Sequence, residues 1–395
     1  MAAAALGVSL STAAASAMVR PEPALSRAGS GPSLNPGSPS SFLDGVSMAS
    51  ATDGWAVGYY QNTTTHILET LILHWNGAAW SKVSSPSPGP NGNLLAGVSA
   101  VSAADVWAVG YQLASSASSS PGKTLILHWN GAAWSKVNSP NPGPNGNLLA
   151  GVSAFSSTDA WAVGYRAMRS SAPGDSLILH WNGTNWAKVK SPNPVTGANP
   201  LNAVSATSGS DAWAVGYSQS ASTSQRSALI LHWNGTAWSN VTSARPGSQS
   251  TLYGVSATSA TDAWAAGDYV SPPALSLTLQ WDGTAWSQAA SPNPGRSYDI
   301  LTGVSADSAT DAWAVGYYSQ PNGYVPHDTL TLHWDGTSWS AVKSPDPGGR
   351  LMGDNDLYGV SAVSPADAWA VGSYYSHGTY HTLILHWNGA AWSKT

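Results

Sequence analysis

A segment of about fifty residues is repeated seven times and limits the possible folds more than any other feature of this sequence. Its constant motifs are GVSA, DAWAVGY, LILHWNG and AWSKV. The tryptophan in the second motif aligns the copies, with spacings of 52, 54, 52, 51, 49 and 56 residues. It falls at Trp55, Trp107, Trp161, Trp213, Trp264, Trp313 and Trp369. One such unit cannot bury its apolar faces alone, so the copies must pack against one another.

Each copy contains four short apolar segments bounded by Gly, Pro, Asn, Asp and Ser, which is the pattern of β-strands. In the second copy we expect them at Leu95–Ser102, Val106–Tyr111, Thr124–Trp129 and Ala133–Asn138. The period predicts an all-β fold, a seven-bladed β-propeller with four antiparallel strands per blade. The first copy begins at a first strand and the last ends at a fourth strand. We therefore expect blades in phase with the chain, with no strand exchanged between the ends.

An Asn-Gly or Asp-Gly pair joins the third and fourth strands of every copy. This pair tolerates positive φ at both positions of a two-residue turn and is the strongest short hairpin signal. It begins at Asn76, Asn130, Asn182, Asn234, Asp282, Asp335 and Asn388.

The chain divides into a leader over residues 1–40 and a propeller over residues 41–395. The leader combines a run of small residues, including Ala15-Ser16-Ala17, with a Pro/Gly/Ser linker. It is either a degraded export signal, which predicts a secreted or cell-surface protein, or a disordered segment. The blades are expected at about 43–86, 95–140, 149–192, 201–244, 252–292, 301–345 and 357–395.

Charged residues make up only 9% of the chain and the net charge is −5, whereas about 25% is usual. The few basic residues are scattered, which argues against nucleic-acid binding. No stretch is apolar enough to predict a membrane span. The sequence has no cysteine and 21 tryptophans, so packing must supply the stability. We expect a monomer.

Two kinds of connection alternate along the chain. The turn between the first two strands and the Asn-Gly turn hardly vary, and in a propeller these share one face, hereafter the constant face. The connections between strands two and three, and between blades, vary widely and share the opposite face, hereafter the variable face. Because loops on a rigid scaffold commonly carry function, we expect a ligand there or at the channel mouth.

A ring of tyrosines ends the second strands near the variable face. Blade five replaces the tyrosine with Asp268, and blade seven replaces it with Ser373 followed by Tyr374. An acid among aromatic residues is a candidate asymmetric site, although drift within one repeat explains it equally well. The candidate ligand-binding residues are Tyr59, Tyr111, Tyr165, Tyr217, Asp268, Tyr317 and Tyr374.

Other repeated polar and aromatic residues have structural explanations. The aspartate two residues before each aligned tryptophan suits a tight turn. The histidine of HWNG occurs in six copies, which lie too far apart around a ring to share one metal. We interpret it as a buried imidazole bonded to a neighbouring strand, with a repeated ligand contact as the alternative. The tryptophans are interpreted as packing between blades, with sugar stacking as the alternative.

No metal site or cofactor motif is indicated. Gly353-Asp354-Asn355-Asp356 faintly resembles a calcium loop but lacks its spaced third acid and terminal Glu. Walker, Rossmann, GxSxG and Cys/His metal motifs are absent from the sequence. No catalytic residue is therefore assigned.

The unit TDAWAVGY…LILHWDGTSWS resembles the Asp-box or sialidase-repeat propellers through its WDGT-x-W turn, at 281–286 and 334–339. Asn replaces Asp in five copies, and the leading Ser of the Asp box is absent. The chain also resembles uncharacterised tryptophan-rich exported bacterial repeat proteins. Sialidases of this type use an arginine triad and a Tyr/Glu pair. Here the only propeller glutamate is Glu69, and the propeller arginines are scattered over loops: Arg166, Arg169, Arg226, Arg245, Arg296 and Arg350.

These observations favour a non-enzymatic, extracellular propeller that binds a glycan or surface polymer through its variable face. One alternative is a hydrolase or lyase at the channel mouth, with Asp268 or Asp299 as acid or base. Another is a protein–protein interaction scaffold, which a flat face poor in aromatic residues would favour.

Overall fold

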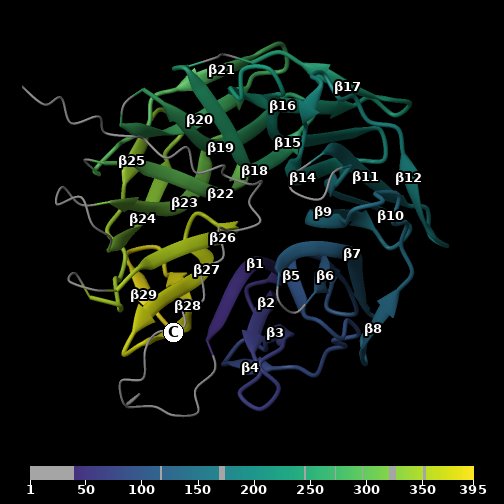
Figure 1. Cartoon of the computed structure of the whole chain (residues 1–395). Coiled ribbons are helices and arrows are strands. Elements are labelled where there is room, and N and C mark those ends of the chain that lie inside the picture. The colour runs from purple at the N-terminus through teal and green to yellow at the C-terminus, as the bar shows by residue number, and fades with distance from the viewer. Residues whose placement is uncertain are drawn as a thin grey trace, which may run out of the picture.

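Seven β-sheets stand around a common axis (Figure 1), in a computed structural model of the chain. It describes residues 40–115, 118–168, 174–243, 246–271, 273–295, 297–319, 326–349 and 353–395, and only the backbone of 118–121. Every element in these residues is a β-strand. The fold is therefore the predicted seven-bladed β-propeller. The predicted leader lies, apart from Ser40, outside the described residues.

The four strands of each sheet run antiparallel in chain order from the axis to the rim. The innermost strands are β1 (Ser41–Ser50), β5 (Asn93–Ser102), β9 (Asn147–Ser156), β14 (Leu201–Ser208), β18 (Gln249–Ser259), β22 (Asp299–Ser308) and β26 (Asn355–Ser364). The second strands are β2 (Asp53–Gln61), β6 (Asp105–Ser115), β10 (Asp159–Arg166), β15 (Asp211–Ser220), β19 (Asp262–Val270), β23 (Asp311–Ser319) and β27 (Asp367–Ser376).

The third strands are β3 (Leu68–Trp75), β7 (Ser118–Trp129), β11 (Asp175–Trp181), β16 (Arg226–Trp233), β20 (Ala274–Trp281), β24 (His327–Trp334) and β28 (Thr379–Trp387). The short outer strands are β4 (Trp80–Lys82), β8 (Trp134–Val137), β12 (Trp186–Val189), β17 (Trp238–Val241), β21 (Trp286–Ala289), β25 (Trp339–Ala341) and β29 (Trp392–Lys394). Blade four has an additional strand, β13 (Gly197–Ala198), because Pro200 cannot donate to the ladder and interrupts the inner strand.

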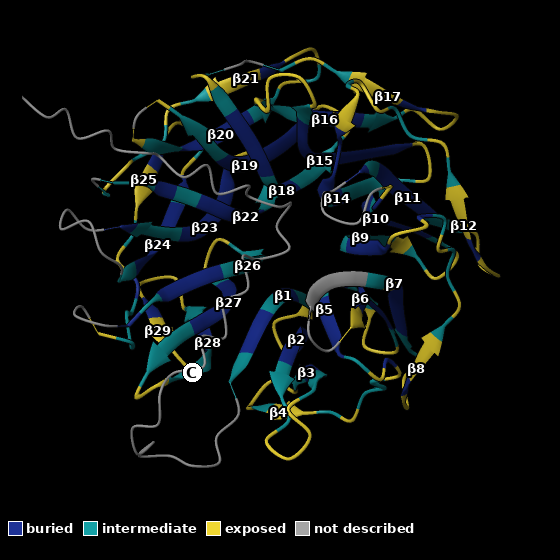
Figure 2. Cartoon of the chain, viewed as in Figure 1, coloured by how far each residue is buried: buried dark blue, intermediate teal, exposed yellow. Residues whose placement is uncertain are grey.

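Tryptophans fill the spaces between blades. The aligned tryptophan of each second strand is at most 1% exposed. Trp107, for example, packs at 4.9 Å from Trp181 and edge-on at 5.2 Å from Trp186 of the next blade. Figure 2 shows buried residues along the middle strands and exposed ones on outer strands such as β8, β12 and β17. The predicted role of these tryptophans in packing between blades is confirmed.

The ring closes without an exchanged strand, as expected from the phase of the repeat. Sheet β1–β4 comes entirely from the first copy and sheet β26–β29 from the last. Trp369 of the last blade packs at 4.8 Å from Trp75 and 5.4 Å from Trp80 of the first. The Ser361 hydroxyl accepts a hydrogen bond from the Met48 backbone amide at 3.1 Å. The equivalent serine makes the same bond at each of the six remaining junctions between blades.

The Asn-Gly turns form hairpins, but the expected two-residue geometry is wrong. Trp75 pairs with Trp80, so the loop has four residues, and only its glycine has positive φ, +86° at Gly77. The Asn76 side chain accepts the backbone amides of Ala78 and Ala79 at 3.0 and 2.9 Å. That side-chain acceptor, with glycine at the left-handed position, explains why the pair is constant.

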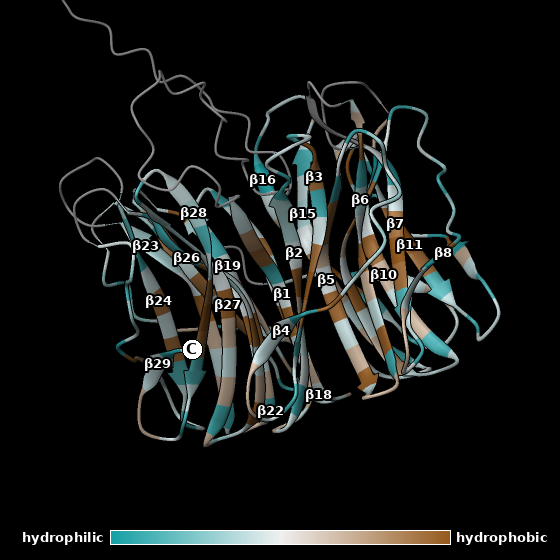
Figure 3. Cartoon of the chain, turned by 90° about the horizontal axis from the view of Figure 1, so that it is seen from below, coloured by the Kyte–Doolittle hydropathy of each residue, from teal (hydrophilic) through white to brown (hydrophobic). Residues whose placement is uncertain are grey.

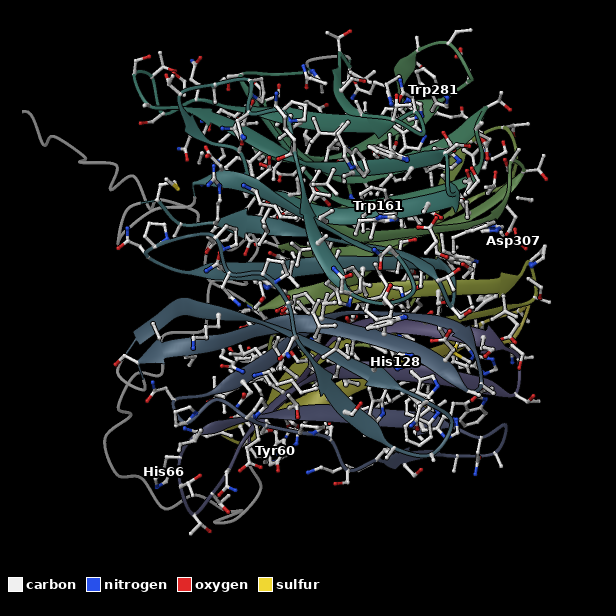
Figure 4. All side chains as sticks on the ribbon, turned by 90° about the vertical axis from the view of Figure 1, so that its right-hand side faces the viewer. Tyr60, His66, His128, Trp161, Trp281 and Asp307 are labelled. Atoms are coloured by element: carbon white, nitrogen blue, oxygen red, sulfur yellow. The ribbon has the colours of Figure 1, made fainter. Side chains whose placement is uncertain are left out.

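The side view in Figure 3 shows the strands spanning the ring from one face to the other, with hydrophobic bands within the strands. Figure 4 places His128 and Asp307 toward one face and His66 toward the opposite one. His128 lies near the constant turns, and His66 lies in a connection between a second and a third strand. The latter face is the variable face.

Candidate functional site at the channel mouth

A β-bulge in every innermost strand turns one residue into the axial channel. The register shifts by one between the leucine and the third position of LxGVSA, so the residue between them has no partner on the second strand. All seven bulge residues line one cavity of about 220 Å³. They are Asp44, Ala96, Ala150, Asn202, Tyr253, Thr302 and Tyr358.

The bulge residue is the second position of LxGVSA, the most variable position of an otherwise constant motif. This variability is the sequence signal that could have revealed the channel-lining residues. Blades two and three place alanines in the channel, whereas blades five and seven place tyrosines. Small side chains therefore line the channel on one side and phenol groups line it on the other.

On the side of blades one to four, the mouth is walled by a continuous hydrophobic cluster, hereafter the aromatic arc. Phe42 and Tyr59 lie 4.9 Å apart between ring centroids, and both are at most 5% exposed. Tyr59, Leu94, Tyr111 and Leu148 also line the cavity. The members of the aromatic arc are Phe42, Tyr59, Leu94, Tyr111, Leu113, Leu148, Tyr165, Ala167 and Tyr217.

On the side of blades five to seven, titratable side chains lie around the mouth, and we call them the ionisable arc. Its members are Tyr253, Asp268, Tyr298, His327, Asp356 and Tyr358. Of its members, Asp268 and Asp356 occupy positions that aromatic-arc residues hold in other blades. Tyr253 donates a hydrogen bond to Asp268. Burial raises the pKa of Asp268 to about 6, against the opposing effects of that bond and of Arg226. Burial and the neighbouring Asp268 raise the pKa of Tyr253 well above its usual value.

Four residues of the ionisable arc form one hydrogen-bonded array. His327, the first residue of β24, contacts Asp356 Oδ1 through Nδ1 at 2.7 Å and the Tyr298 hydroxyl through Nε2. The Tyr358 hydroxyl donates to the other oxygen of Asp356 at 2.9 Å. Tyr317 stacks on the imidazole with 4.7 Å between centroids and 12° between planes.

The charges around this array favour the protonated form of His327. Burial lowers the His327 pKa, but the bond to Asp356 and the charges of Asp356, Asp354 and Asp328 outweigh it, so the pKa is raised. Burial, followed by the charges of Asp356 and Asp354, raises the pKa of Tyr298 to about 12. Tyr298 is therefore a neutral phenol at physiological pH.

The seven predicted ligand residues do not form one site. Tyr59 and Tyr111 line the cavity. Tyr165 and Tyr217 are at most 4% exposed and belong to the aromatic arc, without lining the cavity. Asp268 and Tyr317 lie on the opposite side, in contact with members of the ionisable arc.

Tyr374 does not belong to the ring of tyrosines around the channel mouth, because side chains alternate along β27 and the preceding residue points toward the mouth. It packs between blades six and seven, and Lys394 donates to its hydroxyl at 3.0 Å. Its neighbour Ser373, which pairs with Asp356, occupies the ring position.

Asp299 does not reach the mouth. It is 0% exposed, and its Oδ1 accepts the Gly295 amide at 2.8 Å. Asn93 makes the equivalent bond in blade two and also donates from Nδ2 to the Gly89 carbonyl. Asp299 lacks that donor, so its second oxygen is buried without a hydrogen-bond partner. Burial raises its pKa to about 6.

The repeated aspartates and histidines pair with each other on the constant face. His128 Nε2, for example, lies 2.7 Å from Asp105 Oδ1, and its ring lies 4.2 Å from that of Trp107. The same pair occurs in the six blades that have the histidine. The predicted bond of this histidine to a neighbouring strand is confirmed, but its side chain is 25–30% exposed and not buried as expected.

Of the scattered arginines, two have described side chains. Arg166 forms an ion pair with Asp175 at 2.5 Å, and Arg226 lies over the Tyr217 ring at 4.8 Å. Arg169, Arg245, Arg296 and Arg350 lie outside the described residues. Glu69 accepts hydrogen bonds from Tyr60 and Asn62 within blade one.

Two absences apply to the described residues alone. There, no group of three or more histidine, aspartate or glutamate side chains is placed to hold a metal ion. Within the same part of the chain, no helix is long and apolar enough to cross a membrane.

Comparison with known proteins gives the fold and no closer relationship. No protein family matches the chain, and no curated protein matches its sequence. The polysaccharide lyase PL25 ulvan lyase, bound to -[GlcA(1-4)Rha3S]-, is similar with a TM-score of 0.53 and 11% identity, over 88% of this chain and 94% of that one. The β-propeller domain of the trilobed protease from Pyrococcus furiosus, described as having an open velcro topology, has a TM-score of 0.52 and 8% identity, over 90% and 97%.

YCF48 from Cyanidioschyzon merolae aligns with a TM-score of 0.49 and 14% identity, over 86% of this chain and 94% of that one. The identities to the lyase and to the protease domain are low, so these two structures support the architecture alone. The chain is a seven-bladed β-propeller.

Proposed function

We propose that this chain is an extracellular binding propeller whose channel mouth holds a sugar ring of a glycan or surface polymer. The observation that carries the proposal is the cavity of about 220 Å³, with apolar and tyrosine walls on one side and phenol groups on the other. Aromatic surfaces pack on the apolar faces of sugar rings, and hydroxyl groups bond their edges.

The size of the cavity supports a polymer over a compact small molecule. Pockets for drug-sized ligands begin at about 300 Å³. A smaller cavity that opens among variable loops suits one ring of a chain, with the flanking rings lying across those loops. The low charge of the protein also suits a ligand recognised mainly by hydroxyl groups.

A protein-interaction scaffold is less well supported, because the described part of the mouth is hollow and rich in aromatic residues. The ulvan lyase was solved with a saccharide bound, so a propeller of this fold can hold such a ligand.

The test is a glycan array probed with the full-length chain, followed by titrations monitored by tryptophan fluorescence. Ala96→Tyr and Ala150→Tyr should each fill the cavity and abolish binding. Both variants should fold, because Tyr253 and Tyr358 occupy the equivalent bulges. Ala132→Tyr, in an exposed turn of the constant face, is the matched control and should bind normally. Binding that survives both channel variants would place the ligand elsewhere.

A further inference from the structure

The tyrosines that the bulges place in the axial cavity present oxygen acceptors to it. The Tyr358 hydroxyl donates to Asp356 Oδ2 at 2.9 Å, and the Tyr253 hydroxyl donates to Asp268. The pKa of Asp268, about 6, leaves this carboxyl mostly ionised at neutral pH, so it accepts that bond. A phenol has a single proton, and each of these protons is used within the protein. A ligand therefore meets two phenol oxygens that can accept a hydrogen bond but not donate one.

Two other bulge residues, Thr302 and Asn202, also direct a donor into the protein. The Thr302 hydroxyl lies 3.0 and 2.7 Å from the carbonyl oxygens of Val315 and Leu357, which accept its proton. Asn202 donates from Nδ2 to the Leu252 carbonyl at 2.7 Å, and its Oδ1 is buried without a hydrogen-bond partner. Asn202 is 7% exposed and lines the cavity, and a buried acceptor without a donor is costly. A donor from a ligand would remove that cost.

The charge of the cavity lining is negative. The fifth polar bulge residue is Asp44, and the described residues that line the cavity include no lysine, arginine or histidine. Arg226, which interacts with Asp268, does not line the cavity, and neither does His327, which is bonded to Asp356. An ammonium group is a cation that donates three hydrogen bonds and accepts none. It therefore complements both the acceptors and the charge of this lining.

We propose that the axial cavity binds the protonated amino group of an amino sugar, carried by a glycan or surface polymer. This inference rests on the proposed function and names the class of its ligand. The ammonium group donates to Asp44 and to the Tyr358 oxygen, which blades one and seven place on the adjoining inner strands β1 and β26. Tyr253, two blades away, accepts a hydrogen bond from a ring hydroxyl.

Other classes of sugar fit the lining less well. A carboxylate or sulfate group would face Asp44 and the phenol oxygens without a cation or donor from the described lining to offset the repulsion. An acetylated amino group has lost its charge and two of its three donors, and its carbonyl adds an acceptor. A neutral sugar brings hydroxyl donors but no charge that complements Asp44.

The first experiment titrates the full-length chain by calorimetry with oligosaccharides of equal length. Glucosamine oligomers should bind at least about 10-fold more tightly than N-acetylglucosamine oligomers, because charged hydrogen bonds to a desolvated site are stronger than neutral ones. Galacturonate oligomers should not bind. Ammonium chloride and calcium chloride, titrated without sugar, show whether a cation alone occupies the cavity, and we expect neither to bind as tightly as the glucosamine oligomer.

Variants separate a direct contact from a structural effect, because a merely structural change lowers the affinity for both oligosaccharides alike. Asp44→Asn removes the charge at nearly constant volume and should weaken glucosamine binding by about 10-fold while N-acetylglucosamine binding is unchanged. Asp356→Asn supplies an amide that can donate to the Tyr358 oxygen, so the preference for the free amine should narrow. Asp307→Asn on the constant face is the matched control and should leave both affinities unchanged.

The outcomes distinguish this inference from the proposed function. Equal or tighter binding of the acetylated or galacturonate oligomers would overturn the inference, and the proposed function would stand. Glucosamine binding that survives Ala96→Tyr would place the amine outside the cavity and would also overturn it. Calcium binding tighter than that of the glucosamine oligomer would make the cavity a metal site instead. If no oligosaccharide binds, the proposed function itself is contradicted.

Discussion

The two sides of the channel mouth are built by the same repeat and have opposite character. The aromatic arc repeats an apolar residue on the inner strand facing a tyrosine on the second strand, as in Leu94 and Tyr111. The ionisable arc pairs Thr251 with Asp268 and Asp356 with Ser373 at the same positions. The fold needs neither set in particular, because both are accommodated. The difference therefore marks where the copies of the repeat depart most from one another at the mouth.

The difference between the two arcs can be tested by placing a carboxylate in the aromatic arc. Leu94→Asp copies Asp356 where no histidine is available, so we expect a loss of about 3–5 kcal/mol in unfolding free energy at neutral pH, measured in denaturant. Stability should partly return at acid pH, where the new carboxyl is protonated. Leu94→Asn is the uncharged control and should show no such pH dependence. Equal behaviour of the two variants would mean that charge is not what separates the arcs.

The substitution Asp299→Asn gives blade six the residue that blades two and three have at this position. The amide restores the donor that Asn93 gives to its loop carbonyl. The raised pKa of Asp299, about 6, means that the carboxyl form stabilises the fold at low pH and that this stability is lost as pH rises from 3.8 through 6. The variant should gain about 1–3 kcal/mol above pH 6 and nothing near pH 3, as measured by denaturation at both values. A gain that does not depend on pH would contradict this explanation.

Asp307→Thr sharpens the comparison on the constant face. Thr207 and Thr258 donate to the aspartates of their blades, whereas Asp307 interacts with Asp311 and its pKa is raised, first by burial and then by that like charge. Removing the repulsion should raise the melting temperature at neutral pH, by an amount corresponding to about 1 kcal/mol or less. The gain should vanish at acid pH, where Asp307 is protonated. Thr207→Asp in blade four is the reverse test and should lower stability.

The smallest change in stability is expected for Asp356→Leu, which gives blade seven the residue of blades two and three. An apolar residue of similar volume replaces the carboxylate, and His327 can become neutral, so the unfolding free energy should change by about 1 kcal/mol or less. The His327 pKa should fall, because burial remains and Asp356 is gone. An NMR titration of the imidazole measures this. An unchanged pKa would mean that Asp356 does not hold that proton.

Most of the fold could be predicted from the sequence because it follows from repetition. The aligned tryptophans predicted the number of blades. The first-strand motif that opens the first copy and the fourth-strand motif that closes the last copy predicted closure without an exchanged strand. The turn geometry was wrong because Trp75 and Trp80 pair across four residues, which local dipeptide rules do not include. The predicted blade limits stay a prediction, as does the leader.

The candidate site was predicted only in part. Loop variation and the tyrosine ring indicated the face on which the candidate site lies, and Asp268 lies in the ionisable arc. The array was missed because Tyr298, His327 and Asp356 come from three separate segments that only the ring brings together. The bulge residues were missed because a bulge changes which way one residue points, and the sequence showed only a variable letter in LxGVSA.

The most direct test of the asymmetric mouth is a crystal structure of the protein with an oligosaccharide selected on the array. We predict a sugar ring in the axial cavity on the variable face, in contact with the wall that contains Tyr59 and Tyr111 and bonded to the hydroxyl of Tyr253 or Tyr358. A ligand on the outer loops, or on the constant face among the Asp–His pairs, would contradict the account.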